Sequence, residues 1–408
     1  MSLDPLDNLS EIAESSRAHT PLSNQVGGHP GVLTVADDSL IIKPTLPGEL
    51  HFYQDVLPTT EFDKLRDWIP KFVGTLTRSG ETNEAGDLVV KPEAPSDEKE
   101  WIVLENVSGN FTKPSIVDLK LGTILYDDSA SPDKKERMIK SAAATTSLTT
   151  GVRVTGFQVF DSATFGMIKT EKAYGKSIKP EDLPDAFRRI FPVMSSPCAT
   201  EPSPDATPDP GLPAPTLLRI LLSLRTDVTQ IRAAVESVEM RMVGGSLLIV
   251  YEGHPRIAET IWEVTGGEPG EGEREREERI AVEEGEELDE GLSEEEESEG
   301  SEEGDGDTSV DTSMTTTTHG SVSVSGSQSQ SSEASQSSSN LSSSLSSLSS
   351  GAPSAPYVAR LIDFAHTKLT PGMGPDEGVL IGLDTVLKLL EGRIEEVKKL
   401  IPDNSESA

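Results

Sequence analysis

A stretch of about 90 residues, 266–355, cannot contribute to a packed core. Residues 268–307 hold 21 acidic side chains against three Arg, and residues 321–350 include 18 Ser. A segment so polar and so charged buries too little apolar surface to offset the conformational entropy that folding costs. Because apolar patterns resume after it, the core must combine segments from both sides. Closing a long loop costs entropy that grows only slowly with length, so we expect the strands that flank this insertion to pair directly.

The charge of the chain argues against nucleic acid as a direct ligand. The formal net charge is −35, of which residues 268–307 supply −18. Such a protein repels polyanions over a long range, and no run of Lys or Arg provides a basic face. The acidic tract instead suggests basic protein partners in the nucleus.

No segment has the pattern of a targeting or membrane-spanning element. The start MSLDPLDNLSEIAESSR lacks the basic and apolar regions of a signal peptide. Nowhere do the roughly 20 apolar residues of a membrane-spanning helix follow one another. The single cysteine, Cys198, allows neither an internal disulfide nor a thiolate zinc site. We expect a monomer without membrane insertion, located in the nucleus and cytoplasm.

The chain before residue 113 has the pattern of a small antiparallel sheet. After a polar, disordered segment, 1–24, the sequence VLTVADDSLIIKP predicts two short strands joined at Ala36–Asp38. One helix is predicted to begin at Pro47 and another at Thr60. The second of these carries Phe62, Leu65 and Ile69 at helical spacing. Further strands are predicted at 72–77, 88–91 and 101–105, and we assign 25–112 to an N-terminal lobe.

The segments 113–265 and 356–400 predict a second, larger lobe of mixed α and β structure. The sequences IVDLKLG, GVRVTGFQVF and YVARLIDFAHT predict strands. The Gly244-Gly245 pair between two apolar runs predicts a β-hairpin. Residues 195–216 are Pro-rich and are expected to form a mobile loop, and 401–408 a tail. Helices are predicted over 132–142, with Ser131 as its cap, over 216–237, and along the stripe Val379, Leu380, Leu383, Val386, Leu387 and Leu390.

Two residues of the sequence PSIVDLKLG combine charges in a way that suits nucleotide chemistry. Asp118 and Lys120 are two apart on a predicted strand, so both side chains project from one face. A carboxylate there can accept hydrogen bonds from hydroxyl groups, and an ammonium group can balance phosphate charge. Gly122 allows close approach of the backbone. Taken alone, the pair more often indicates an exposed strand face.

Three further residues have a functional and a structural interpretation. Asp363 follows an apolar strand, where it could ligate Mg²⁺ or simply form a turn. Lys43 ends a strand near the N-terminus, where it could hold phosphates or be solvated. His366 is a lone histidine, which is usually structural. None of the three decides the question by itself.

The predicted helix over 132–142 can present several cations from one side. Lys134 and Arg137 are three residues apart and share a face, with Lys140 at its edge. In so acidic a protein, a soluble polyphosphate requires a concentrated local cationic patch of this kind. The alternative is a solvated helix in which Asp133 and Glu136 pair with the cations.

The motifs and their order resemble the inositol polyphosphate kinase family, and within it the multikinases of fungal and plant type. The resemblance rests on SLIIKP at 39–44, WIVLENV at 101–107, PSIVDLKLG at 114–122, SLLIVYEG at 246–253 and RLIDFAH at 360–366. It implies a two-lobed α+β fold, related to that of protein kinases. It also implies ATP and Mg²⁺ as cofactors and soluble inositol phosphates as substrates.

The resemblance also implies a role for each candidate residue. Lys43 would bind the ATP phosphates, and the backbone at Glu105 and Val107 would pair with adenine. Asp118 would bind the ribose hydroxyls, Asp363 the metal, and Lys120 would lie between the transferring phosphate and the acceptor hydroxyl. Lys134 and His366 would contact the acceptor. Arg137 and Lys140 are assigned to the same role as much from their position on the helix as from the resemblance. Ser246 would assist the metal and the phosphates.

These implications predict a kinase that acts on inositol trisphosphate and tetrakisphosphate. Only one helix is predicted between Gly122 and Gly151, so we expect an open site with relaxed substrate choice. Two alternatives remain open at this stage. One is a hexakisphosphate kinase that makes pyrophosphates, and the other is a transcription-linked interaction protein that uses the acidic tract.

Overall fold

The computed structural model describes residues 20–27, 31–78, 80–82, 88–90, 99–196, 207–268, 270–273, 275, 276, 279 and 353–402. The chain up to Arg276 and from Pro353 onward forms one compact unit. A discontinuous core is therefore confirmed. The predicted disordered start and most of the predicted insertion lie outside the described residues. None of the described helices is long and apolar enough to cross a membrane.

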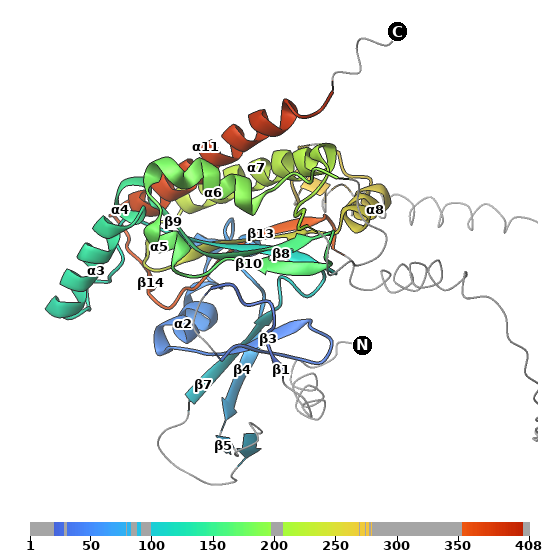
Figure 1. Cartoon of the computed structure of the whole chain (residues 1–408). Helices are drawn as coiled ribbons and strands as arrows, with labels where there is room; N and C mark the ends of the chain where they lie inside the picture. The colour runs from blue at the N-terminus through green and yellow to red at the C-terminus, as the bar shows by residue number, and fades with distance from the viewer. Residues whose placement is uncertain are drawn as a thin grey trace, which may run out of the picture. The chain divides into compact units, whose positions relative to one another are not determined.

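The N-terminal lobe contains a five-stranded antiparallel sheet with the strand order β1-β2-β3-β7-β4 (Figure 1). The two short strands predicted around Ala36–Asp38 are confirmed as β2 and β3. The polar segment predicted to end at residue 24 ends earlier, because Thr20 already pairs with Thr34. The strands are β1 Thr20–Pro21, β2 Leu33–Thr34, β3 Leu40–Pro44, β4 Phe72–Arg78 and β7 Lys99–Glu105.

The predicted helix at Pro47 is confirmed, but the one predicted at Thr60 is not continuous. Helix α2, Pro47–His51, passes directly into a π-helical turn, η1, at Phe52–Val56. Beyond it lie two separate 3₁₀ turns, η2 at Thr60–Phe62 and η3 at Arg66–Trp68. No side-chain cap closes the first of these turns. The predicted apolar residues are nevertheless buried, so their spacing reflects burial rather than one long helix.

The strand predicted at 88–91 does not join the main sheet among the described residues. It forms β6, Leu88–Val90, which pairs antiparallel with β5, Gly80–Thr82, as a separate two-stranded ladder. The sequence pattern identified the strand correctly but could not identify its partner.

The C-terminal lobe is built on a second antiparallel sheet with the order β10-β9-β8-β12-β13. Strands β12 and β13, which flank the insertion, pair directly from Ser246↔Ile362 to Tyr251↔Tyr357, as predicted. The strands are β8 Pro114–Leu121, β9 Val152–Asp161, β10 Gly166–Lys169, β12 Ser246–Glu252 and β13 Tyr357–Ile362.

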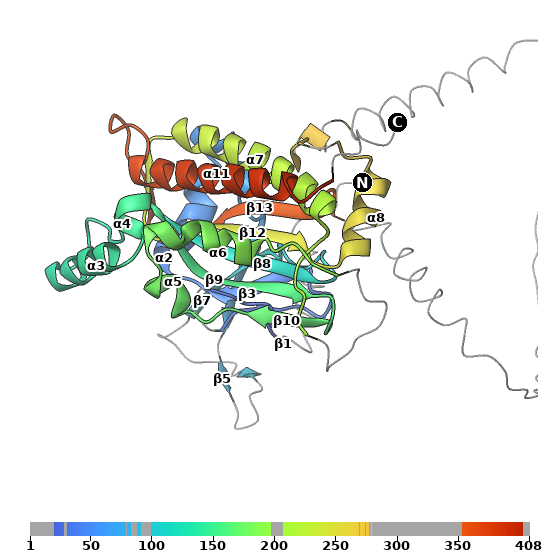
Figure 2. The same cartoon turned by 45° about the horizontal axis from the view of Figure 1, so that its top comes forward.

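Helices cover one face of this sheet. Figures 1 and 2 show α6, α7 and α11 on the same side, with α7 and α11 next to each other. Val117 and Leu119 of β8 point into this apolar layer, together with Leu247 and Ile249 of β12. The helices are α3 Pro132–Ala144, α4 Ser147–Thr150, α5 Tyr174–Ser177, α6 Leu183–Ile190, α7 Ala214–Glu236, α8 Pro255–Thr265 and α11 Glu377–Lys398.

The β-hairpin predicted at Gly244-Gly245 is wrong. Strand β11, Met240–Met242, pairs with β14, Thr367–Leu369, while β12 enters the large sheet between β8 and β13. Gly244 still makes a turn, with a φ of 84° that only glycine adopts without strain. The turn separates two sheets rather than joining two paired strands.

Two predicted boundaries also need correction. The second half of the Pro-rich loop is held in place, because Pro210 pairs with Asp161 and Leu212 pairs with Val193. The insertion was predicted to begin at 266, but packing continues to Arg276. There the carboxylate of Glu273 lies 2.7 Å from Arg360. Arg276 is fully buried, with its guanidinium 4.5 Å from the centre of the Trp262 ring.

Candidate active site

The candidate site lies on the face of the large sheet that the helices leave uncovered. Along β8, Ile116, Asp118 and Lys120 alternate with the residues that face the helices, so all three share this face. The sheet register places Ser246 of β12 next to Lys120, and Leu248 next to Asp118. The period-two argument for Asp118 and Lys120 therefore holds in the structure, whatever their function.

Asp363 reaches the same place from the end of β13. It follows Ile362, which is paired with Ser246 of β12, so β12 alone separates it from the strand that carries Lys120. Its φ of 67° lies in the left-handed region, which Asp tolerates better than most side chains. The next residue fixes the turn, because the Phe364 ring stacks on Phe52 with centroids 4.2 Å apart. A strained polar residue anchored in this way is typical of functional sites.

Lys43 joins the N-terminal lobe to Asp363. Its Nζ lies 2.7 Å from Oε1 of Glu49 and 3.4 Å from Oδ1 of Asp363. Burial alone would lower the pKa of Lys43, but the two carboxylates outweigh it and raise the pKa. Lys43 is therefore a fixed cation between two anions. Glu49, on α2, was not predicted, although its place six residues after Lys43 is visible in the sequence.

Asp118 is a buried carboxylate without a full set of partners. The residue is 4% exposed, and its Oδ1 has no hydrogen-bond partner among the described residues. Burial, aided by the negative charge of Asp363, raises the pKa of Asp118 to about 6, against the opposing effects of Ser246 and Lys120. Such a group gains most from a ligand that donates hydrogen bonds to it.

We expect Asp118→Asn to stabilise the fold above pH 6. The folded pKa lies above the unfolded value of 3.8, so the ionised carboxylate costs stability as pH rises from 3.8 to about 6. The full cost is up to about 3 kcal/mol. Thermal unfolding of both proteins from pH 4 to pH 8 tests this. The advantage of the variant should grow up to about pH 6 and then stay constant, and a constant difference over the whole range would contradict the burial argument.

Lys120 is held by the turn at Gly244. Its Nζ donates to the carbonyl oxygen of Gly244, so the glycine turn positions the ammonium group. Burial lowers the pKa of Lys120, although the Asp118 and Asp363 charges oppose this. The ammonium group is therefore held on the site face, where the charges of both carboxylates act on it.

Glu105 is the last residue of β7, and Val107 lies in the connection from β7 to β8. The Glu105 N–H donates to the carbonyl oxygen of Lys71, and its side chain accepts from the Lys71 N–H at 3.2 Å. Val107 packs with Phe111, Ile116 and Val250 in a small apolar cluster beside the site face. The structure thus places this connection at the Ile116 end of the site, away from Lys120.

The predicted cationic helix is confirmed as α3, with Ser131 as its cap, but its cations do not all lie together. His366 Nδ1 lies 2.8 Å from Asp127, which precedes the helix. The pKa of Asp127 is lowered mainly by a hydrogen bond from Ser129, and the Lys134 charge lowers it further. Lys140 instead pairs with Glu136 at 2.6 Å and is largely exposed. Among the described contacts, none joins Arg137 or Lys140 to the other predicted residues.

A segment near the N-terminus covers part of the site. Val26 packs against the apolar cluster around Val107, and Lys169 of β10 donates to the Ser23 carbonyl at 2.9 Å. A side chain at Gly27 would collide with the Asp118 carboxylate. The polar character of this segment hid its packing role from sequence analysis.

The described residues suit a metal ion that has one protein ligand and takes its other ligands from bound phosphate groups and water. Among them, no group of three or more His, Cys, Asp or Glu could hold a metal ion. The Asp363 side chain is about one-third exposed, and its ion pair with Lys43 uses the Oδ1 atom. One carboxylate fits a hard cation that is otherwise bound by phosphate oxygens and water.

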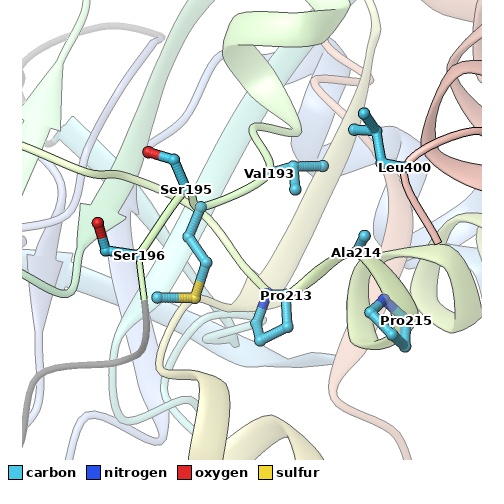
Figure 3. Close-up of a pocket in the computed structure, with 8 residues that line it drawn as sticks. Val193, Ser195, Ser196, Pro213, Ala214, Pro215 and Leu400 are labelled. Carbon is cyan, nitrogen blue, oxygen red and sulfur yellow. The ribbon is translucent and has the colours of Figure 1, made fainter. Parts of the chain in front are cut away.

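A separate hollow of about 540 Å³ lies away from these residues (Figure 3). It is bordered by Val193 and Met194, by the start of α7 at Pro213–Pro215, and by Leu400 beyond α11. None of the predicted site residues lines it.

Comparison with known proteins gives consistent matches. Residues 101–391 match the family described as inositol polyphosphate kinase. Inositol polyphosphate multikinase of Saccharomyces cerevisiae is 28% identical over 90% of this chain and 96% of its own length. The Schizosaccharomyces pombe multikinase is 31% identical over 41% of this chain and 61% of its own length. Mouse inositol hexakisphosphate kinase 3 is 32% identical over 43% of this chain and 41% of its own length.

A solved structure shares the fold. The crystal structure of the S. cerevisiae inositol phosphate multikinase in complex with ADP and Mn²⁺ aligns with a TM-score of 0.51 at 22% identity. The alignment covers 87% of this chain and 99% of that one. At this identity the likeness establishes the mixed α+β fold.

Proposed function

The chain belongs to the inositol polyphosphate kinase family, and from this premise we propose that it is a multikinase that phosphorylates inositol trisphosphate and tetrakisphosphate towards pentakisphosphate. Members of the family are ATP-dependent phosphotransferases. The similarity to the S. cerevisiae multikinase over nearly its full length supports the finer assignment.

One observation carries this proposal. Lys43, Asp118, Lys120 and Asp363 come from distant parts of the sequence and converge on one face, where Asp363 contacts Lys43 and its charge acts on both Asp118 and Lys120. A buried acceptor, two cations and an accessible carboxylate are the groups that bind a metal-nucleotide complex.

The position of each residue indicates its role in the reaction. Asp118 accepts hydrogen bonds from the ribose, beside the apolar cluster of Val107 that would face adenine. Lys43 holds the phosphates, and Lys120 neutralises charge between the transferred phosphoryl group and the acceptor hydroxyl. Asp363, with Ser246 nearby, would hold a divalent cation, Mg²⁺ in the cell. When bound, that cation neutralises charge on the β- and γ-phosphates.

The acceptor would bind at the Lys120 end of β8. His366 and Lys134 lie on this side, joined through Asp127. Arg137 and Lys140 are exposed on α3, and their contribution to acceptor binding stays a prediction. Because only α3 and the short α4 stand between β8 and β9, the acceptor side is lightly enclosed, which favours relaxed substrate choice.

The decisive experiment incubates the purified protein with Mg-ATP and a panel from inositol trisphosphate to hexakisphosphate and resolves the products. We expect trisphosphate and tetrakisphosphate to be consumed. Exclusive use of hexakisphosphate would favour the alternative of a hexakisphosphate kinase, which the similarity to the mouse enzyme keeps open. Absence of phosphorylation of every member would overturn the proposal. The idea that the acidic tract binds nuclear partners concerns residues outside those described.

A further inference from the structure

Arg153 is a cation on the site face that none of the assignments above includes. It lies on β9 directly opposite Lys120 in the sheet register. Its neighbours Val152 and Val154 point into the helix-covered core, so the Arg153 side chain projects from the opposite face, where Lys120 and Asp118 stand. The Arg153 charge acts on both of these residues.

The Arg153 guanidinium lacks a fixed partner in the part of the chain that the structure describes. Among the described residues, no hydrogen bond or ion pair to it is found, and the residue is half-buried. Burial lowers the pKa of Arg153, only partly offset by the Asp118 charge. The two cations beside it are both held by described contacts: Lys43 by two carboxylates, and Lys120 by the Gly244 carbonyl oxygen. A half-buried guanidinium beside a second cation is costly unless an anion joins them.

The strand order indicates which bound anion would lie between Arg153 and Lys120. In the order β10-β9-β8-β12-β13, Arg153 stands on one side of Lys120, and Ser246 and Asp363 stand on the other. The nucleotide phosphates and their metal belong to the Asp363 side. Arg153 is also the second residue of β9, which follows α4 at Gly151, so it lies at the end of the sheet next to α3 and α4.

We propose that Arg153 and Lys120 together bind one phosphate group of the acceptor, with Arg153 as a specificity-determining residue of the acceptor site. This inference rests on the proposed function. A guanidinium offers a planar pair of donors that matches two phosphate oxygens, and Lys120 supplies a point charge on the other side. Binding the acceptor phosphate between them also brings a neighbouring hydroxyl towards Lys120.

The test compares Arg153→Gln and Arg153→Lys with the parent enzyme in steady-state kinetics. We expect Arg153→Gln to raise the KM for inositol trisphosphate by at least about tenfold, the loss typical of a hydrogen bond to a charged group. The KM for ATP and the Kd for Mg-ADP, measured without acceptor, should stay within about twofold. Arg153→Lys keeps the charge but loses the fork, so it should recover only part of the affinity.

The matched control is Arg189→Gln. Arg189 is exposed on α6, on the helix-covered side of the sheet, and pairs with Asp185 at 3.0 Å. It should leave both KM values unchanged. If Arg153→Gln weakens Mg-ADP binding as much as acceptor binding, or changes neither, the acceptor role is wrong while the proposed function stands. If the parent enzyme phosphorylates no inositol phosphate, the proposed function itself fails. Should Arg153→Gln not fold, Arg153→Lys still decides through the ratio of the two KM values.

Discussion

Asp363→Asn is expected to lower the rate of phosphoryl transfer by about a thousandfold or more and to leave the fold intact. The substitution removes the one accessible carboxylate of the site, and with it the anionic oxygen that would ligate the metal. Asn has the same shape and tolerates the left-handed conformation at this position, where φ is 67°. Lys43 keeps its closer partner, Glu49, so it is not left as an unpaired buried cation.

Two measurements separate a metal role from a structural one. The Mn²⁺ or Mg²⁺ dependence of ADP binding should be lost in Asp363→Asn, whereas ADP binding in EDTA should change little. The pKa of Asp118 should also fall towards its ordinary value, because the Asp363 charge helps to raise it. Asp376→Asn is the matched control: the two Asp376 oxygens accept from the Val379 and Met242 N–H groups, and Asn has one acceptor oxygen for the two donors, so it should lower stability and not turnover. Full activity of Asp363→Asn with inositol trisphosphate would show that the metal assignment is wrong.

The sequence predicts those parts of this fold that depend on local pattern. The period-two alternation placed Asp118 and Lys120 on one face, and the apolar stripe placed α11 against the core. The direct pairing of β12 with β13 was predictable as well, because closing a long loop costs little. These features follow from burial and from chain entropy, which a single sequence records.

Features that depend on the choice of a distant partner were not predictable. The two apolar runs around Gly244 do fit a hairpin, but β12 gains more by pairing along its whole length with β8 and β13. The position of Arg153 becomes meaningful only when the register opposite Lys120 is known. Likewise, nothing local indicates that Gly27 lies against Asp118, because the two are joined by packing alone.

Lys120→Met is expected to lower kcat by about a hundred- to a thousandfold, the range for loss of one preorganised charge at a site of phosphoryl or acyl transfer. Met is unbranched and of similar length, so the cavity stays filled. The Lys120 ammonium group is the group best placed between the nucleotide side, at Ser246 and Asp363, and the acceptor side, at Arg153.

The burial of Lys120 separates its expected effect on catalysis from its effect on folding. Burial lowers the pKa of Lys120 in the folded protein, so near neutral pH its charged form opposes folding. Lys120→Met should therefore unfold at the same temperature as the parent enzyme or a higher one, even as kcat collapses. Lys398→Met, at the exposed end of α11 where Lys398 pairs with Glu395, is the control and should change neither quantity. If the variant keeps kcat within about threefold, or loses activity only in proportion to the loss of folded protein, then Lys120 stabilises the sheet and has no role in phosphoryl transfer.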